Sequence, residues 1–337
     1  MLAPGGGRTR QCPGMAVIAG FPPGGTGCTL GAVTSVTGGK DAMVPGFAAS
    51  EIDTSKPHPA RMYDAYLGGK DNYAADREAV RQILRTWPEV RDMARANRAF
   101  MQRAVRFLAG EAGIRQFIDI GTGIPSAGNV HEVAGQVAPG AKVVYVDNDP
   151  IVHVHANALL TGSGTTAIVL ADLRDPGAIL AHPKVGELID FRQPVALLLV
   201  AILHFIAEAE DPAGIVARLR DALPPGSYLA LSHGTADFHP PGVAGQAAAS
   251  YEHATAPLVL RTFEQVSPFF DGFGLVDPGL VQAPLWRPDG KPPRLILRTS
   301  CGSTWVGSSG PTPGLRGGAI ATCCGPAGMC RAVGRGR

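Results

Sequence analysis

The sequence of 337 residues carries a formal net charge of +2, but its charges are unevenly distributed. Seven of the 30 Lys and Arg residues, and none of the 28 acidic residues, lie in residues 1–40 and 300–337, which leaves 23 basic and 28 acidic side chains between them. This acidic middle lacks the basic surface of a nucleic-acid-binding protein, and because all six cysteines lie outside it, it holds neither a disulfide nor a thiolate metal site.

The ends of the chain differ from its middle. Both are rich in Gly and show no amphipathic period, so we expect a disordered N-terminal extension over residues 1–56 and a disordered Gly/Cys/Arg-rich tail over 300–337, flanking one domain at 57–299. The longest apolar run, residues 195–203, is about half of what a membrane-spanning helix needs. We therefore expect a cytoplasmic protein with no membrane partner.

Residues 57–110 are predicted to form a helical cap. A short helix begins near Ala60, a Gly-Gly break follows, Asp71 or Asn72 caps a second helix, and a third helix runs from about residue 89 to 109. Around the glycines we expect either a lid that excludes water or a merely packed helical cap. The residues expected to face the substrate there are Tyr63, Tyr66, Lys70, Asn72 and Tyr73.

From residue 116 onward, predicted strands and helices alternate. The strands are expected at 116–120, 142–147, 166–171, 195–203 and 227–232, and the helices between them at 129–137, 150–160, 176–180 and 212–222. This rhythm indicates a doubly wound, Rossmann-like α/β sheet. Further helices near 244–256 and 262–270 and short closing strands near 275–281 and 294–298 predict that the chain ends in an antiparallel hairpin.

The turn after the first strand, Gly121-Thr122-Gly123, is the centre of the expected binding site. It is not the G-x-G-x-x-G turn of dinucleotide enzymes, because the third glycine is replaced by Ser126. Asp119, two residues before Gly121, suits an ammonium group better than a pyrophosphate. The turn therefore favours S-adenosyl-L-methionine over NAD, the alternative being an ordinary βα turn without a ligand.

Acidic residues end the next two strands. Asp147, with Asn148 beside it, is placed to accept hydrogen bonds from ribose hydroxyls, and Asp149 to cap the following helix. Asp172 is spaced to accept from an adenine amine while the Leu173 amide donates to the ring. The alternatives are helix caps for the first pair and a turn acid for Asp172.

Two histidines follow the expected fourth and fifth strands. His204 lies where a parallel sheet performs its chemistry and is the candidate to orient a substrate or remove its proton. His233 is also placed near the site. Either histidine could instead be a satisfied residue at a strand end. His131 and Glu132 lack the second histidine of a zinc motif, so we expect no metal.

The chain from about Pro57 to Arg298 resembles an actinobacterial family of class I S-adenosylmethionine-dependent methyltransferases. The segments that carry the resemblance include ARMYDAYLGGKDNYAADRE, ARANRAFMQRAVRFLA, FIDIGTGIPSAGNVHE, VVYVDNDPIV, LLLVAILHFI, DPAGIVARLRDALPPGSYLALSH and TAPLVLRTFEQVSPFFDG. The resemblance implies a seven-stranded sheet with an antiparallel last strand, and cofactor contacts at Asp119, Gly121, Gly123 and Asp147. It names no methyl acceptor.

Together these observations predict an enzyme that transfers a methyl group from S-adenosyl-L-methionine to a small-molecule acceptor. Two alternatives remain open at this point: an NAD(P)-dependent oxidoreductase, and a non-catalytic S-adenosylmethionine-binding protein. The sequence does not predict the oligomeric state.

Overall fold

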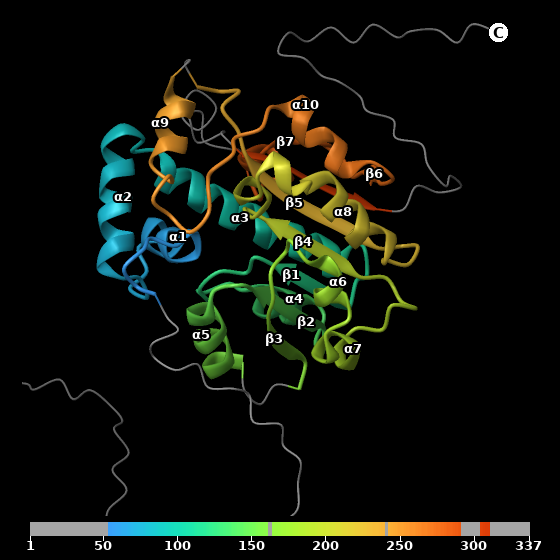
Figure 1. The fold of residues 1–337 in the computed structure, drawn as a ribbon. Helices are drawn as coiled ribbons and strands as arrows, with labels where there is room; N and C mark the ends of the chain where they lie inside the picture. The colour runs from blue at the N-terminus through green and yellow to red at the C-terminus, as the bar shows by residue number, and fades with distance from the viewer. Residues whose placement is uncertain (1–52, 161–163, 240–241, 291–303, 311–337) are drawn as a thin grey trace, which may run out of the picture. The chain divides into compact units, whose positions relative to one another are not determined.

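A mixed β-sheet forms the centre of the described structure (Figure 1). The computed structural model describes residues 53–160, 164–239, 242–290 and 304–310, all within one unit of the chain, residues 47–337. Five strands run parallel in the order β3-β2-β1-β4-β5. They are β1 (Gln116–Ile120), β2 (Lys142–Asp147), β3 (Thr166–Leu170), β4 (Ala196–Val200) and β5 (Tyr228–Gly234).

Three further strands complete the sheet. β8 (Thr304–Gly310) runs antiparallel to β5, and two short strands, β6 (Gly274–Leu275) and β7 (Val281–Gln282), run antiparallel to β8. The predicted α/β sheet is thus confirmed, but seven strands is wrong, because the described residues form eight. The strand expected at 294–298 lies outside the described residues.

β8 also lies inside residues 300–337, so the expected disorder of that segment is wrong for Thr304–Gly310. Its first three residues, Thr304 to Val306, favour strands, but the Gly and Ser residues at 307–310 do not. Six of its residues pair with β5, and backbone hydrogen bonding to a preformed neighbour overrides local preference.

Strand side chains alternate between two hydrophobic cores. Ile118 and Ile120 of β1 pack in the first core, which includes residues of four helices, whereas Phe117 packs in the second core, which includes residues of three. Because Asp119 alternates with Ile118 and Ile120, it shares the face of Phe117. The helices of the first core are α6 (Pro176–Leu180), α7 (Pro183–Leu188), α8 (Pro212–Asp221) and α10 (Phe263–Val266); those of the second are α3 (Val90–Gly110), α4 (Val130–Val137) and α5 (Pro150–Leu160). α7 was not predicted.

A third core lies away from the sheet. It joins α1 (Pro59–Leu67), α2 (Ala74–Thr86) and α3 to α9 (Val243–Ala249) and to Tyr251. Figure 1 shows α1, α2 and α9 together on one side of the strands. The helices predicted within 57–110 therefore exist.

The predicted cap of α2 is wrong. Its N-cap residue is Tyr73, whose backbone N–H donates to Asp76 Oδ2 at 2.8 Å. The Asp71 N–H and Asn72 Nδ2 instead donate to Asp64, at 3.0 and 2.7 Å. The polar groups of this turn therefore donate hydrogen bonds to a carboxylate of the preceding helix, α1. No local pattern in the sequence indicates these contacts.

α5 (Pro150–Leu160) has its expected bounds. α9 and α10 (Phe263–Val266) begin within one residue of their predicted starts and end early: α9 stops at Ala249, and α10 passes into a 3-10 turn, Ser267–Phe270. Within the described ranges, no helix is both long and apolar enough to cross a membrane.

Candidate active site

Two tight turns meet at the carboxyl ends of β1 and β4, where the strand order reverses. Gly121 has φ +77°, and a Cβ atom placed on it would lie 2.6 Å from Cγ1 of Ile202, so no other residue fits without movement. Ala201, just before Ile202, is itself left-handed at φ 57°, and its N–H donates to Ser232 Oγ at 2.8 Å. Such strain in a non-glycine residue is typical of functional sites.

Asp147, at the end of β2, is bound to the glycine turn. Its Oδ2 accepts from the Gly123 N–H at 2.8 Å, and its Oδ1 from the Asp149 N–H at 2.9 Å. Burial raises the pKa of Asp147 to about 6, although these backbone hydrogen bonds and one from the Asn148 amide act in the opposite direction. This carboxylate is held rigidly beside the turn.

Asp119 is the second buried carboxylate of the turn. Burial raises its pKa to about 7; the positive charge of Arg98 and a hydrogen bond from Thr122 lower it, and the charge of Asp147 raises it further. Arg98 comes from α3, and its Nη2 donates to the Ser126 carbonyl at 3.1 Å and to Asn129 Oδ1 at 2.7 Å. α3 thus fastens the loop that leads from the glycine turn to α4.

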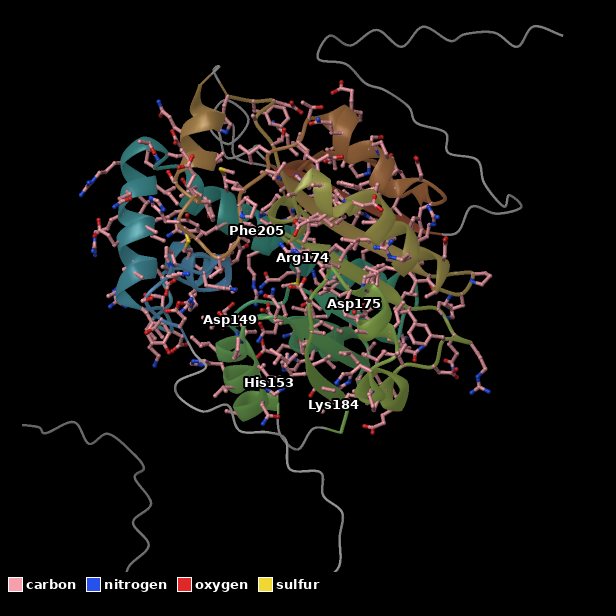
Figure 2. The ribbon with its side chains drawn as sticks, viewed as in Figure 1. Asp149, His153, Arg174, Asp175, Lys184 and Phe205 are labelled. Carbon is pink, nitrogen blue, oxygen red and sulfur yellow. The ribbon has the colours of Figure 1, made fainter. Side chains whose placement is uncertain are left out.

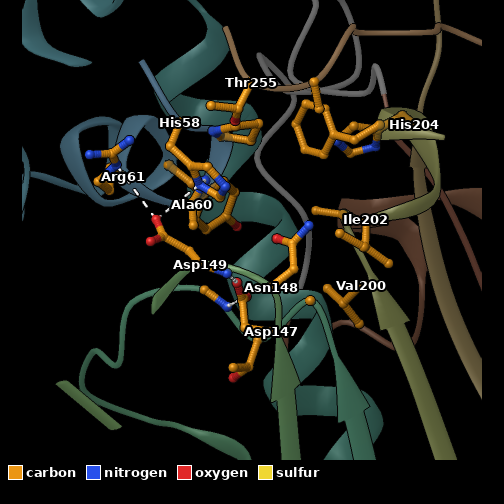
Figure 3. Close-up of a pocket in the computed structure, with 18 of the residues that line it drawn as sticks. His58, Ala60, Arg61, Asp147, Asn148, Asp149, Val200, Ile202, His204 and Thr255 are labelled. Atoms are coloured by element: carbon orange, nitrogen blue, oxygen red, sulfur yellow. Dashed lines mark hydrogen bonds and ion pairs between the residues drawn. The ribbon is translucent and has the colours of Figure 1, made fainter. Parts of the chain in front are cut away.

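Asp149 caps α5, as predicted, and also contacts α1. Its Oδ1 accepts from the Ile151 N–H at 2.9 Å. Its Oδ2 lies 3.2 Å from His58 Nδ1 and 3.5 Å from Arg61 Nε, and Figure 3 shows the carboxylate between these two side chains. Arg61 and Asp149 are only 2% and 4% exposed, so this is a buried ion pair.

Asp172 lies at the rim of the site. Its Oδ2 accepts from Asn148 Nδ2 at 2.9 Å, and its Oδ1 from the Arg174 N–H at 2.9 Å. Burial raises the pKa of Asp172, but the hydrogen bonds from Arg174 and Asn148 outweigh it, and the pKa falls below its usual value. Arg174 Nη2 also donates to the Phe205 carbonyl at 3.2 Å (Figure 2), and the Leu173 side chain is buried in the first core.

His204 lies in the turn after β4. The Gly234 N–H donates to its Nδ1 at 3.2 Å, so Nδ1 is unprotonated and the ring hydrogen is on Nε2. Burial and the nearby charge of Arg261 lower the pKa of His204 to about 3. As a neutral ring with Nε2–H, His204 can donate a hydrogen bond, but it is a poor proton acceptor at neutral pH.

His233 has both ring nitrogens satisfied. Its Nδ1 lies 2.7 Å from the Gly234 carbonyl, and Arg261 Nη1 lies 3.1 Å from its Nε2. The ring is completely buried, and burial lowers its pKa well below the usual value. His233 is not among the described residues that line the cavity, but its ring centroid lies 5.5 Å from that of His204, which does line it.

These groups surround one cavity of about 470 Å³. One wall consists of the turns after β1, β2, β3 and β4, and the other of α1, α2, α3 and the segment after α9. Figure 3 shows residues of both walls, with Asp147, Asn148 and Asp149 together on one side of the cavity. The glycine turn is therefore only one part of a larger two-walled site.

The sequence model of a family described as S-adenosyl methyltransferase matches residues 45–307. The chain belongs to this family. Two crystal structures are similar to it. One, of a DUF574 family protein from Streptomyces avermitilis, is 46% identical with a TM-score of 0.74, and the match covers 77% of this chain and 99% of that one. The other, from Thermobifida fusca and provisionally assigned as a methyltransferase, is 44% identical with a TM-score of 0.72, covering 77% and 96%. No curated protein matches the chain.

Membership of the S-adenosyl methyltransferase family makes this chain an S-adenosylmethionine-dependent methyltransferase, with S-adenosyl-L-methionine as its cofactor. It decides against the NAD(P)-dependent oxidoreductase. The residues present fit this cofactor. A carboxylate has about four acceptor positions, so Asp147, with its three backbone amides, keeps room for a ligand hydroxyl.

Only some of the residues predicted to form a lid or substrate contact line the cavity. Tyr63 and Tyr66 line it, whereas Lys70, Asn72 and Tyr73 are not among its described lining residues. Tyr73 and Lys70 are exposed, and Asn72 is occupied with Asp64. The glycine break turns these three residues away from the site.

Sequence reasoning missed several residues that shape the site. They are His58, Arg61, Asn97, Arg98, Ile202 and Arg261. Arg261 is buried and donates to the Leu203 and Ile206 carbonyls at 3.1 and 3.0 Å, which fixes the turn that carries His204. Arg261 gave a signal, because it directly follows the apolar run at 258–260, whereas Arg98 lies beside Arg95 and Gln102 on α3 and gave none.

Proposed function

We propose that this methyltransferase transfers a methyl group to a small molecule bound in the cavity between the strand ends and α1–α3. The observation that carries the proposal is the pair of buried carboxylates, Asp119 and Asp147, on either side of one left-handed glycine turn. Buried acids without a full set of partners are costly unless a ligand satisfies them. Both line the same cavity.

Each part of the cofactor has a candidate partner in this site. Asp119, which accepts a hydrogen bond from the Thr122 side chain, would accept from the ammonium group of the methionine portion, and Gly121 and Gly123 line the cavity beside them. Asp147 would accept from a ribose hydroxyl. Asp172 and the Leu173 amide would contact the adenine, with Asn148 holding the Asp172 carboxylate in position.

S-adenosylmethionine supplies a methyl group already activated by its positive sulfur, so the protein mainly has to align the acceptor. The hydrogen bond from Gly234 to His204 Nδ1 weakens the role of base that the sequence suggested for His204. We propose instead that His204 orients the acceptor by donating from Nε2.

A small acceptor is supported by the way the cavity is covered. Helices α1–α3 contribute Tyr63, Tyr66 and Met93 to the wall that faces the strand ends, so the acceptor would bind between these helices and the sheet. The acidic middle of the chain adds a charge argument against nucleic acid.

The test uses S-adenosylmethionine labelled in the methyl group, incubated with the enzyme and an actinobacterial extract that is then passed through a small-pore filter. We expect enzyme-dependent label in the filtrate, in a compound other than the cofactor. Label retained with protein or nucleic acid contradicts the small-molecule acceptor. Absence of transfer together with tight cofactor binding favours the remaining alternative, a non-catalytic binding protein.

A further inference from the structure

The part of the cavity under α1–α3 is apolar, and we call it the acceptor chamber. It is lined by Tyr66, Ile83, Trp87, Met93, Tyr251 and Leu258, all of which belong to the third core or pack against it. None of these six side chains is charged. An ionic acceptor group would lose its hydration here without gaining a counter-charge from these residues.

Asn97, which also lines the cavity, has a side-chain oxygen whose position is fixed and which has no hydrogen-bond partner. Tyr63 Oη lies 3.0 Å from the Ala94 carbonyl and 3.0 Å from Asn97 Nδ2. A carbonyl can only accept, so the single tyrosine hydrogen points at Ala94, and Tyr63 must accept from the amide nitrogen of Asn97. This determines the orientation of the Asn97 amide, and its Oδ1 is left as a buried acceptor without a hydrogen-bond partner.

Trp87 supplies the complementary feature. Its ring is 5% exposed, and its Nε1–H is a buried donor without a partner. Asn97 is 4% exposed, and both residues line the cavity. An unmet donor and an unmet acceptor at buried positions each cost stability, and a ligand that satisfies both regains it.

The chamber offers no strong base. His204 Nδ1 already accepts from the Gly234 amide, and the Tyr66 and Tyr251 hydroxyls share a hydrogen bond of 3.1 Å. A hydroxyl nucleophile needs a base to take its proton. A neutral amine attacks with its own lone pair, and after the new C–N bond replaces the C–S bond, whose electron pair stays on sulfur, the N–H proton passes to water.

We infer that the acceptor is an uncharged, largely apolar and weakly basic amine, such as an aromatic amine, whose N–H is held by Asn97 Oδ1 in the acceptor chamber. This inference rests on the proposed function and adds the chemical class of the acceptor. It also assigns Asn97 and Trp87 to acceptor recognition.

Three probes with the same skeleton test the class: 4-propylaniline, 4-propylphenol and 3-(4-aminophenyl)propanoate. Binding is measured by calorimetry in the presence of S-adenosylhomocysteine, and transfer with labelled cofactor. We expect 4-propylaniline to bind about tenfold more tightly than the carboxylate and to be methylated faster than the phenol. Three outcomes overturn the inference and leave the cofactor assignment intact: the carboxylate binds as tightly as the aniline, the phenol is methylated faster, or none of the three probes binds while S-adenosylhomocysteine does. Failure of S-adenosylhomocysteine to bind overturns both.

Two variants test whether Asn97 binds the acceptor or the cofactor. Asn97→Leu and Trp87→Phe are expected to weaken 4-propylaniline about tenfold and to leave S-adenosylhomocysteine affinity within about twofold. Leu108→Met is the matched control, because it conserves volume at a buried position of the second core, removes no polar atom and lies outside the described cavity lining. A tenfold loss of S-adenosylhomocysteine affinity in Asn97→Leu means that Asn97 binds the cofactor and overturns the assignment.

Discussion

Asp149 Oδ2 lies 3.5 Å from Arg61 Nε, and this buried ion pair joins α1 to the turn after β2. His58 Nδ1 lies 3.2 Å from the same Oδ2 and 3.3 Å from the Ala60 N–H, from which it can accept a hydrogen bond only when it carries no proton. Burial lowers the pKa of His58 below its usual value, so at neutral pH Nδ1 caps α1 and Arg61 supplies the charge facing Asp149. Because the Asp149 N–H also holds Asp147, the first helix and the expected ribose contact share one support.

Removing Asp149 should destabilise the protein strongly. Asp149→Ala leaves Arg61 buried with one carboxylate, Asp76, at 3.6 Å, and breaking a buried pair costs about 3–5 kcal/mol. Asp92→Ala, which breaks an exposed pair with Arg95, should cost less than about 1 kcal/mol. Urea unfolding measures both free energies. Similar small values for the two variants would show that the buried pair contributes little.

Asp119→Asn should stabilise the protein without ligand. The pKa of Asp119 in the folded state, about 7, exceeds its ordinary value of 3.8, so the folded state binds more protons and its stability from this group falls as pH rises from about 4 to 7. The shift corresponds to at most about 4 kcal/mol. The variant should therefore be more stable than wild type at pH 8, with the difference disappearing near pH 4, while it loses affinity for S-adenosylhomocysteine. A variant that is less stable than wild type at pH 8 contradicts the raised pKa.

The two glycines of the turn should respond differently to alanine. Both are left-handed, at φ +77° and +67°, which costs alanine about 1–2 kcal/mol. At Gly121 the new Cβ also meets Ile202, whereas at Gly123 its nearest neighbour is Ala60 Cβ at 4.0 Å. Gly121→Ala should therefore lower the free energy of unfolding more than Gly123→Ala. In a double-mutant cycle with Ile202→Ala, only Gly121→Ala should show a favourable coupling; equal losses without coupling would rule out the close approach.

His204 should not titrate in the physiological range. Its pKa is lowered to about 3, so its ring resonances should stay constant from pH 8 to pH 5 in NMR spectra of protein with labelled histidine. His204→Gln identifies the resonance. A midpoint between pH 6 and 7 would restore His204 as a candidate base.

The parallel half of the sheet was predictable because its signals are local. β1 and β2 have their predicted bounds, since each is a short apolar run ended by a turn or an acid. β8 was not predictable from the sequence, because its Gly- and Ser-containing segment is ordered by pairing with β5, about 70 residues earlier in the chain.

The candidate site divides in the same way. Asp119, Gly121 and Asp147 lie at the carboxyl ends of neighbouring parallel strands, so their positions at one edge of the sheet could be expected from the topology. The contacts of His58 and Asn97 depend on how α1 and α3 pack over that edge, which periodicity does not determine. His233 faces Arg261, a residue 28 positions later in the chain, and no local pattern in the sequence indicates that contact.

The central claim is that S-adenosyl-L-methionine binds at the turn between Asp119 and Asp147. Calorimetric titration of S-adenosylhomocysteine into wild type and Asp147→Ala, with the fold of the variant verified by circular dichroism, tests it most directly. We predict binding to wild type and a loss of roughly tenfold to hundredfold in the variant, which corresponds to one or two charge-assisted hydrogen bonds. Wild-type affinity in a folded Asp147→Ala protein would contradict the account.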